Sequence, residues 1–93
     1  MIRSGKMSRL DASKIAGLLT DKTSATWGPD ERGGLVARIE SKPALYVSRT
    51  WNGTLQLRPP GVGMRVVGDN LFGRGWHIRA AALLADQPEV RRV

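Results

Sequence analysis

The chain has no cysteine and a single histidine, and both shortages exclude kinds of chemistry. Without cysteine there is no disulfide framework, thiolate zinc site, iron–sulfur cluster or thiol nucleophile. One histidine argues against a protein-built zinc centre, because such sites need three or four ligands. No pair of carboxylates has catalytic spacing either. We therefore predict no metal, no cofactor and no catalytic residues.

Long hydrophobic runs are also missing. No apolar stretch approaches the ~18–20 residues of a membrane span, and residues 1–6 lack the apolar region of a signal peptide. A length of 93 residues corresponds to one domain. We expect a single small domain over residues 1–93, cytoplasmic and without membrane contact, with flexible ends at 1–7 and 89–93.

Acidic residues are scarce relative to basic ones. The chain has 8 Asp and Glu against 15 Lys and Arg, a formal net charge of +7. Residues 41–68 contain no acid at all, and their basic residues are Lys42, Arg49, Arg58 and Arg65. No block of five or six like charges occurs, as it would in a disordered basic tail. We therefore expect a basic patch assembled by folding, which suits nucleic acid or an acidic protein surface.

The apolar spacing predicts one helix near each end of the chain. Residues 8–11, Ser-Arg-Leu-Asp, have the form of a capping box, and a helix-spaced apolar pattern follows them, so we place a helix at 9–20. A second apolar stripe covers 76–86 and ends before Pro88. Residues 21–34 carry Gly and Pro turn signals, which predict a long loop.

Between the helices the sequence predicts three or four short strands. Residues 35–40 alternate weakly, 44–51 and 54–58 flank the hairpin signal Asn52-Gly53, and 64–67 could form a fourth strand. Together with the helices, this order is α-β-β-β-(β)-α. It predicts an α+β domain in which a small antiparallel sheet carries its N-terminal and C-terminal helices on one face.

The hydrophobic pattern of this hairpin also predicts its register. A two-residue loop would put Leu45 and Val47 on the opposite face from Leu55 and Leu57. A three-residue loop over 51–53, with its glycine in the left-handed conformation, puts all four on one face. We therefore expect the three-residue loop.

An alternative fold is a winged helix-turn-helix, in which residues 29–41 would be helical and the hairpin would be the wing. The adjacent Gly33 and Gly34 would cost such a helix about 2 kcal/mol relative to alanine. Whichever fold holds, an unpaired edge strand in so small a sheet allows a homodimer.

The candidate binding residues cluster on the hairpin and its neighbours. At the tip, Trp51 with Arg49 could stack on bases or anchor a protein partner, unless Trp51 folds back over the core. On the exposed sheet face, we expect Arg38, Arg58 and Arg65 among short polar side chains, a mixture that suits phosphate contacts, although an ordinary solvated face would look similar. The candidate nucleic-acid-binding residues are Arg38, Lys42, Tyr46, Arg49, Trp51, Asn52, Arg58 and Arg65.

Three functional hypotheses follow. The first is a small non-enzymatic nucleic-acid-binding protein, with DNA and RNA both open. The second is a phage or bacterial accessory module that docks on an acidic host protein through Trp51 and Arg49. The third is a small ribonuclease toxin in which His77 acts as acid and base with help from Tyr46, although no second base is positioned by spacing.

Overall fold

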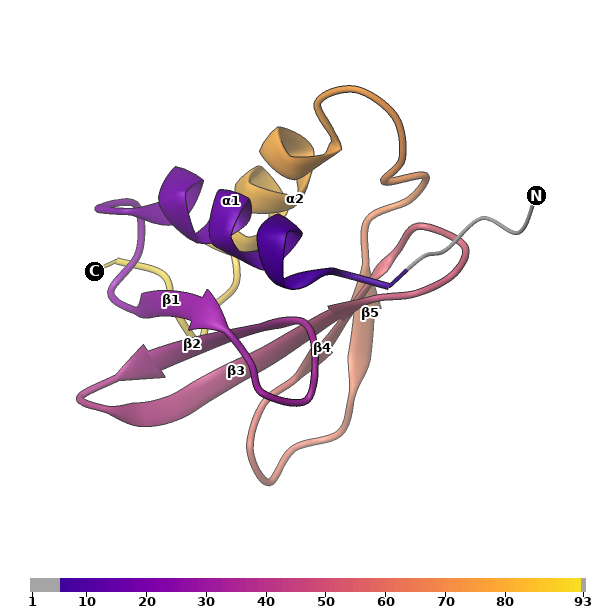
Figure 1. Ribbon diagram of the computed structural model, residues 1–93. Coiled ribbons are helices and arrows are strands. Elements are labelled where there is room, and N and C mark those ends of the chain that lie inside the picture. The colour runs from indigo at the N-terminus through magenta and orange to yellow at the C-terminus, as the bar shows by residue number, and fades with distance from the viewer. Residues whose placement is uncertain (1–5, 93) are drawn as a thin grey trace.

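The computed structural model describes residues 6–92, which form two helices and a five-stranded antiparallel sheet (Figure 1). The elements, in chain order, are α1 (Arg9–Leu19), β1 (Thr26–Pro29), β2 (Leu35–Ile39), β3 (Lys42–Arg49), β4 (Leu55–Arg58), β5 (Arg65–Val67) and α2 (Trp76–Ala85). The strands lie in the sheet in this same order. The α+β class with terminal helices is confirmed. Residues 29–41, which the winged alternative would make helical, form the end of β1, a turn and β2.

The predicted capping box begins α1. The Ser8 hydroxyl oxygen accepts a hydrogen bond from the Asp11 backbone N–H at 3.0 Å, and the Asp11 carboxylate accepts one from the Ser8 N–H at 3.0 Å. Two N–H groups that would otherwise lack partners at the start of the helix are thereby satisfied. The helix then buries Ala12, Ile15 and Leu19 at the spacing that the sequence predicted.

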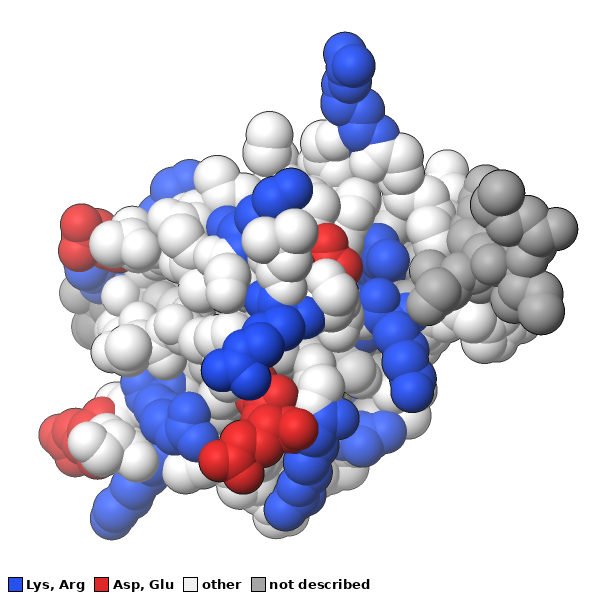
Figure 2. Space-filling model, viewed as in Figure 1, with Lys and Arg blue, Asp and Glu red and all other residues white. Residues whose placement is uncertain are grey.

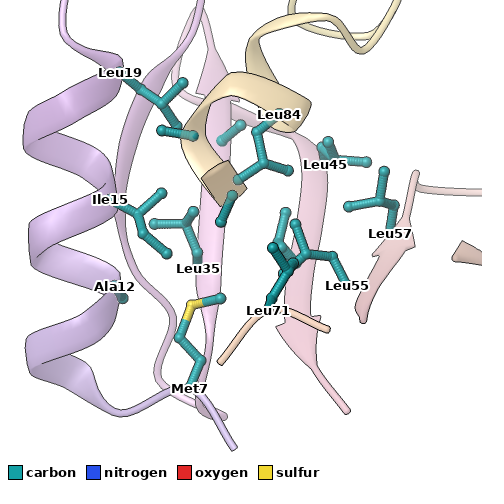
Figure 3. Close-up of a cluster of buried hydrophobic side chains, with 14 of the residues drawn as sticks. Met7, Ala12, Ile15, Leu19, Leu35, Leu45, Leu55, Leu57, Leu71 and Leu84 are labelled. Atoms are coloured by element: carbon teal, nitrogen blue, oxygen red, sulfur yellow. The ribbon is translucent and has the colours of Figure 1, made fainter. Parts of the chain in front are cut away.

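The hydrophobic core lies between the helices and one face of the sheet. Both helices lie on the same side of the sheet in Figure 1. Figure 3 shows the side chains of α1 and α2 meeting those of the strands. The sheet contributes four leucines that are 0% exposed, Leu35, Leu45, Leu55 and Leu57. We call the opposite side of the sheet the outer face. No helix covers the outer face within residues 6–92.

β1 was not predicted and lies within the loop expected at 21–34. Trp27 on this strand pairs with Ala37 and packs against the core. Its indole N–H donates to the Thr23 hydroxyl at 2.8 Å, and Thr23 is 4% exposed. A four-residue edge strand that contains Gly28 and ends on Pro29 has a weak sequence signal, because proline is tolerated at an edge but typical of turns.

Both ends of the described chain pack against the domain. Met7 is 5% exposed and joins the core, and Val90 is 0% exposed. The Val90 carbonyl accepts a hydrogen bond from the Ser24 N–H at 2.9 Å. The backbone of Arg91 forms an isolated antiparallel β-bridge with Thr23. The sequence predicted flexible ends because neither segment has a helix or strand pattern. Residues 1–5 and 93 of those predicted ends lie outside the described residues.

Candidate nucleic-acid interface

The outer face of β3 and β4 carries polar and basic side chains. The strands pair Tyr46 with Arg58 and Ser48 with Gln56, while Val47 and Leu57 between them point into the core. The Gln56 side-chain oxygen accepts hydrogen bonds from the Ser48 hydroxyl at 3.3 Å and from the Arg58 guanidinium at 3.2 Å. Tyr46 and Arg58 are thus direct cross-strand neighbours, as the predicted register requires.

Arg38 and Lys42 lie on either side of the β2–β3 turn. Alternation along β2 puts Arg38 on the outer face with Val36, which pairs with Tyr46, and Arg38 is exposed. Glu40 and Ser41, with φ angles of 53° and 68°, form a two-residue turn, so β2 ends at Ile39. Lys42 is exposed and begins β3, opposite Ile39 and at the far end of the sheet from Trp51.

The hairpin tip has the predicted three-residue loop. The Thr50 N–H donates to the Thr54 carbonyl at 2.8 Å, and Gly53 has φ +78°. Trp51 projects from this loop and is 79% exposed, so it does not fold back over the core. Asn52 is occupied within the loop, where its side-chain oxygen accepts from the hydroxyls of Thr50 and Thr54. The loop therefore presents Trp51 to solvent and uses Asn52 to shape the turn.

Arg49 lies on the helix side of the sheet. Its guanidinium carbon is 3.8 Å from the centroid of the Trp76 ring. It donates to the carbonyls of Leu71 at 3.1 Å and Lys6 at 3.5 Å. Burial lowers the pKa of Arg49, and the nearby Asp11 carboxylate opposes that shift. In this structure Arg49 ties the hairpin to α2 and to the N-terminal segment, away from Trp51 and the outer face.

Arg65 also lies on the helix side, which makes its predicted place on the outer face wrong. β5 pairs Arg65 with Leu57, a core residue, so the outer position of β5 belongs to Val66, which is 57% exposed. The Arg65 guanidinium donates to both carboxylate oxygens of Glu89 at 2.7 and 2.6 Å. Hydrogen bonds from Arg65 lower the pKa of Glu89 below its ordinary value, although burial acts in the opposite direction.

His77 links the two helices. Its Nε2 is 2.8 Å from an oxygen of Asp11, and its ring centroid is 4.0 Å from that of Trp76. Burial alone would raise the pKa of Asp11, but hydrogen bonds from His77 and Ser8 bring it below its ordinary value. The sheet lies between His77 and the outer-face residue Tyr46. The two residues of the ribonuclease hypothesis are therefore not brought together.

The charges on the strands differ from those on the helix side. Figure 2, viewed as in Figure 1, shows Lys and Arg spread over this face of the molecule, with Asp and Glu interrupting them at separate places. The five strands contain no Asp or Glu, and their basic residues are Arg38, Lys42, Arg49, Arg58 and Arg65. Of the remaining three, Arg38 and Arg58 lie on the outer face, whereas Lys42 pairs with Ile39, a position of the helix side at the end of the sheet. Among residues 6–92 none of the three has a carboxylate within ion-pair distance.

The structure adds Arg32 and Asp30, which are not among the predicted binding residues. Both belong to the loop between β1 and β2, and they line a hollow together with Tyr46, Ser48 and Arg58. The sequence predicts only a long loop here, which gives its charged residues no defined place on the sheet. Only the pairing of β1 with β2, which was not predicted, brings the loop to the edge of the outer face.

These features define a class: a small basic α+β domain whose helices cover one face of a five-stranded antiparallel sheet and, within residues 6–92, leave the other face without a helix. In comparisons with protein-family models, curated proteins and solved structures, nothing matches the chain. Within residues 6–92, every helix is too short or too polar to cross a membrane.

Proposed function

We propose that this chain is a small non-enzymatic nucleic-acid-binding protein that contacts its ligand with the outer face of the sheet and with Trp51. The observation that carries the proposal is the cross-strand pair Tyr46–Arg58 on an open face of a sheet without acidic residues. An aromatic ring beside an arginine suits a base next to its phosphate.

Each part of the outer face has a matching role. Arg38 and Arg58 would neutralise phosphates, and the side chains of Ser48 and Gln56 would add hydrogen bonds to the backbone, which fix position rather than sequence. Tyr46 would supply a stacking surface, as would the exposed ring of Trp51. The ligand would then run from Arg38 past Arg58 and along the hairpin towards its tip.

The number of unpaired cations sets the expected salt dependence. If Arg38 and Arg58 each neutralise one phosphate, log K should fall against log salt with a slope of about −1.4 on single strands and about −1.8 on duplex DNA. A protein bound only by apolar contacts would show almost no slope.

A salt-titrated binding assay with fluorescent single-stranded DNA, duplex DNA and RNA tests the proposal. Arg58→Gln should weaken binding and make the salt slope shallower by about one unit. The matched control is Arg74→Gln, an equal loss of charge at an exposed position in the segment between β5 and α2. Equal effects of the two substitutions, or no binding at low salt, would refute the proposal.

A second candidate is a module that docks on an acidic protein. Two exposed apolar side chains favour this candidate, because Trp51 is 79% exposed and Val66 is 57% exposed. Nucleic-acid binding does not require both of them. Tryptophan and arginine are common at the centres of protein interfaces. For this candidate, a partner should stay bound after nuclease digestion and be lost with Trp51→Ala. A partner released by nuclease would rule it out.

A further inference from the structure

The outer face has a hollow where the loop between β1 and β2 meets β3 and β4. The hollow has a volume of about 260 Å³, and its lining includes Asp30 and Arg32 from the loop and Tyr46, Ser48 and Arg58 from the strands. Pockets for drug-sized ligands measure about 300–1,000 Å³, so this one has room for a single small unit. It forms one end of the proposed interface.

The loop is held against the sheet. The Asp30 N–H donates to the Gly34 carbonyl at 3.0 Å, and the Gly33 N–H donates to the Asp30 carbonyl at 3.0 Å. A Cβ atom on Gly34 would collide with the Val47 carbonyl oxygen, so the loop backbone lies directly on β3. The hollow is thus built from two parts of the chain whose relative position is fixed.

The side chains of the hollow combine three chemistries. Tyr46 offers an aromatic ring, and Arg32 and Arg58 are cations without a carboxylate partner among residues 6–92. Asp30 adds a carboxylate, which repels a phosphate but accepts hydrogen bonds from an amino group, as it does from cytosine N4. One ligand would therefore meet positive charge, a ring and an acceptor side by side.

We infer that this hollow binds one nucleotide of a single strand, with its phosphate at Arg32 and Arg58, its base on Tyr46, and an exocyclic amino group of the base at Asp30. The inference rests on the proposed function and makes it more specific. A base inside a duplex has no free face for Tyr46, whereas an unpaired base does. Thymine and uracil have no amino group to donate, so the hollow should disfavour them.

The test measures binding of fluorescent oligo(dC), oligo(dT) and a duplex of equal length by anisotropy at low salt. We expect oligo(dC) to bind more tightly than oligo(dT) and than the duplex. Tyr46→Leu, which removes the stacking face and keeps apolar cover, should weaken oligo(dC) binding about tenfold. Arg32→Gln, at an exposed loop position, should weaken binding of both single strands, while the control Arg74→Gln should not. Urea unfolding checks that each variant is folded.

The outcomes separate this inference from the proposed function. Binding that depends on Arg58 and Tyr46 but is equal for duplex and single strands, or is unchanged by Arg32→Gln, would overturn the nucleotide site and leave the wider proposal standing. Loss of the preference for oligo(dC) in Asp30→Asn would support the role of the carboxylate, and an undiminished preference would refute it. Absence of binding to every oligonucleotide would overturn both.

Discussion

Replacing Gly53 by alanine should destabilise the domain strongly, because two separate costs fall on one residue. Gly53 has φ +78°, and a left-handed conformation costs an L-residue about 1–2 kcal/mol. A Cβ atom there would also lie 2.5 Å from the Phe72 ring and 2.9 Å from the Leu71 backbone nitrogen. Forcing an atom into such a packed site costs about 1–3 kcal/mol more. The two costs sum to about 2–5 kcal/mol. This is a large part of the free energy of unfolding expected for a domain of this size, which is about 5–14 kcal/mol.

Gly61→Ala is the matched control. Gly61 has φ +72°, but a Cβ atom there would meet nothing within 4 Å. Its substitution should therefore cost only the backbone term, about 1–2 kcal/mol. Urea unfolding followed by circular dichroism gives both free energies, and thermal melts should separate the variants by about 5–20 °C. Equal losses in the two variants would refute the packing of the hairpin tip against Leu71 and Phe72.

Three further predictions concern single side chains. Because the pKa of Asp11 lies below its ordinary value of 3.8, its stabilisation should be complete above that value and be lost as the pH falls through the lower pKa of the folded state; urea unfolding at several pH values should therefore show Asp11→Asn costing most stability above pH 3.8 and progressively less at lower pH, and a constant cost would contradict this. Arg49→Met should lower the free energy of unfolding by about 2 kcal/mol, because the contact with Trp76 and the bonds to backbone carbonyls are lost; an unchanged value would mean that Arg49 is not structural. Trp51→Ala should leave the same free energy within about 0.5 kcal/mol, since Trp51 is 79% exposed, and a larger loss would place the ring in the core.

Local signals predicted the features of the fold that depend on neighbouring residues. The capping box at Ser8 and the apolar spacing after it identified α1, and the requirement that Leu45 and Leu57 share one face identified the hairpin loop. Both depend on rules with a strong physical basis over a few residues. These rules do not predict contacts between residues that lie far apart in the sequence.

The features that were missed depend on longer connections. The register between β4 and β5 decides on which side of the sheet Arg65 lies. The intervening Pro59–Met64 segment contains no turn signal that fixes this register. Arg49 shares the parity of the core residue Val47, but its partners Trp76 and Leu71 lie more than twenty residues away along the chain. The sequence shows that Arg49 and Arg65 are basic, but only the tertiary structure shows that they bind other parts of the domain.

The ordering of the strands has a consequence for how the chain folds. Each strand pairs with the next along the chain, so the sheet can grow by successive short-range closures that carry little loop entropy. The contacts Asp11–His77 and Thr23–Arg91, by contrast, join opposite ends of the sequence and must close the largest loops. We expect these closures to form after the rate-limiting step. Weakening these contacts should then accelerate unfolding while leaving the refolding rate nearly unchanged. The contacts between the two ends of the chain would thus stabilise a sheet that has already formed.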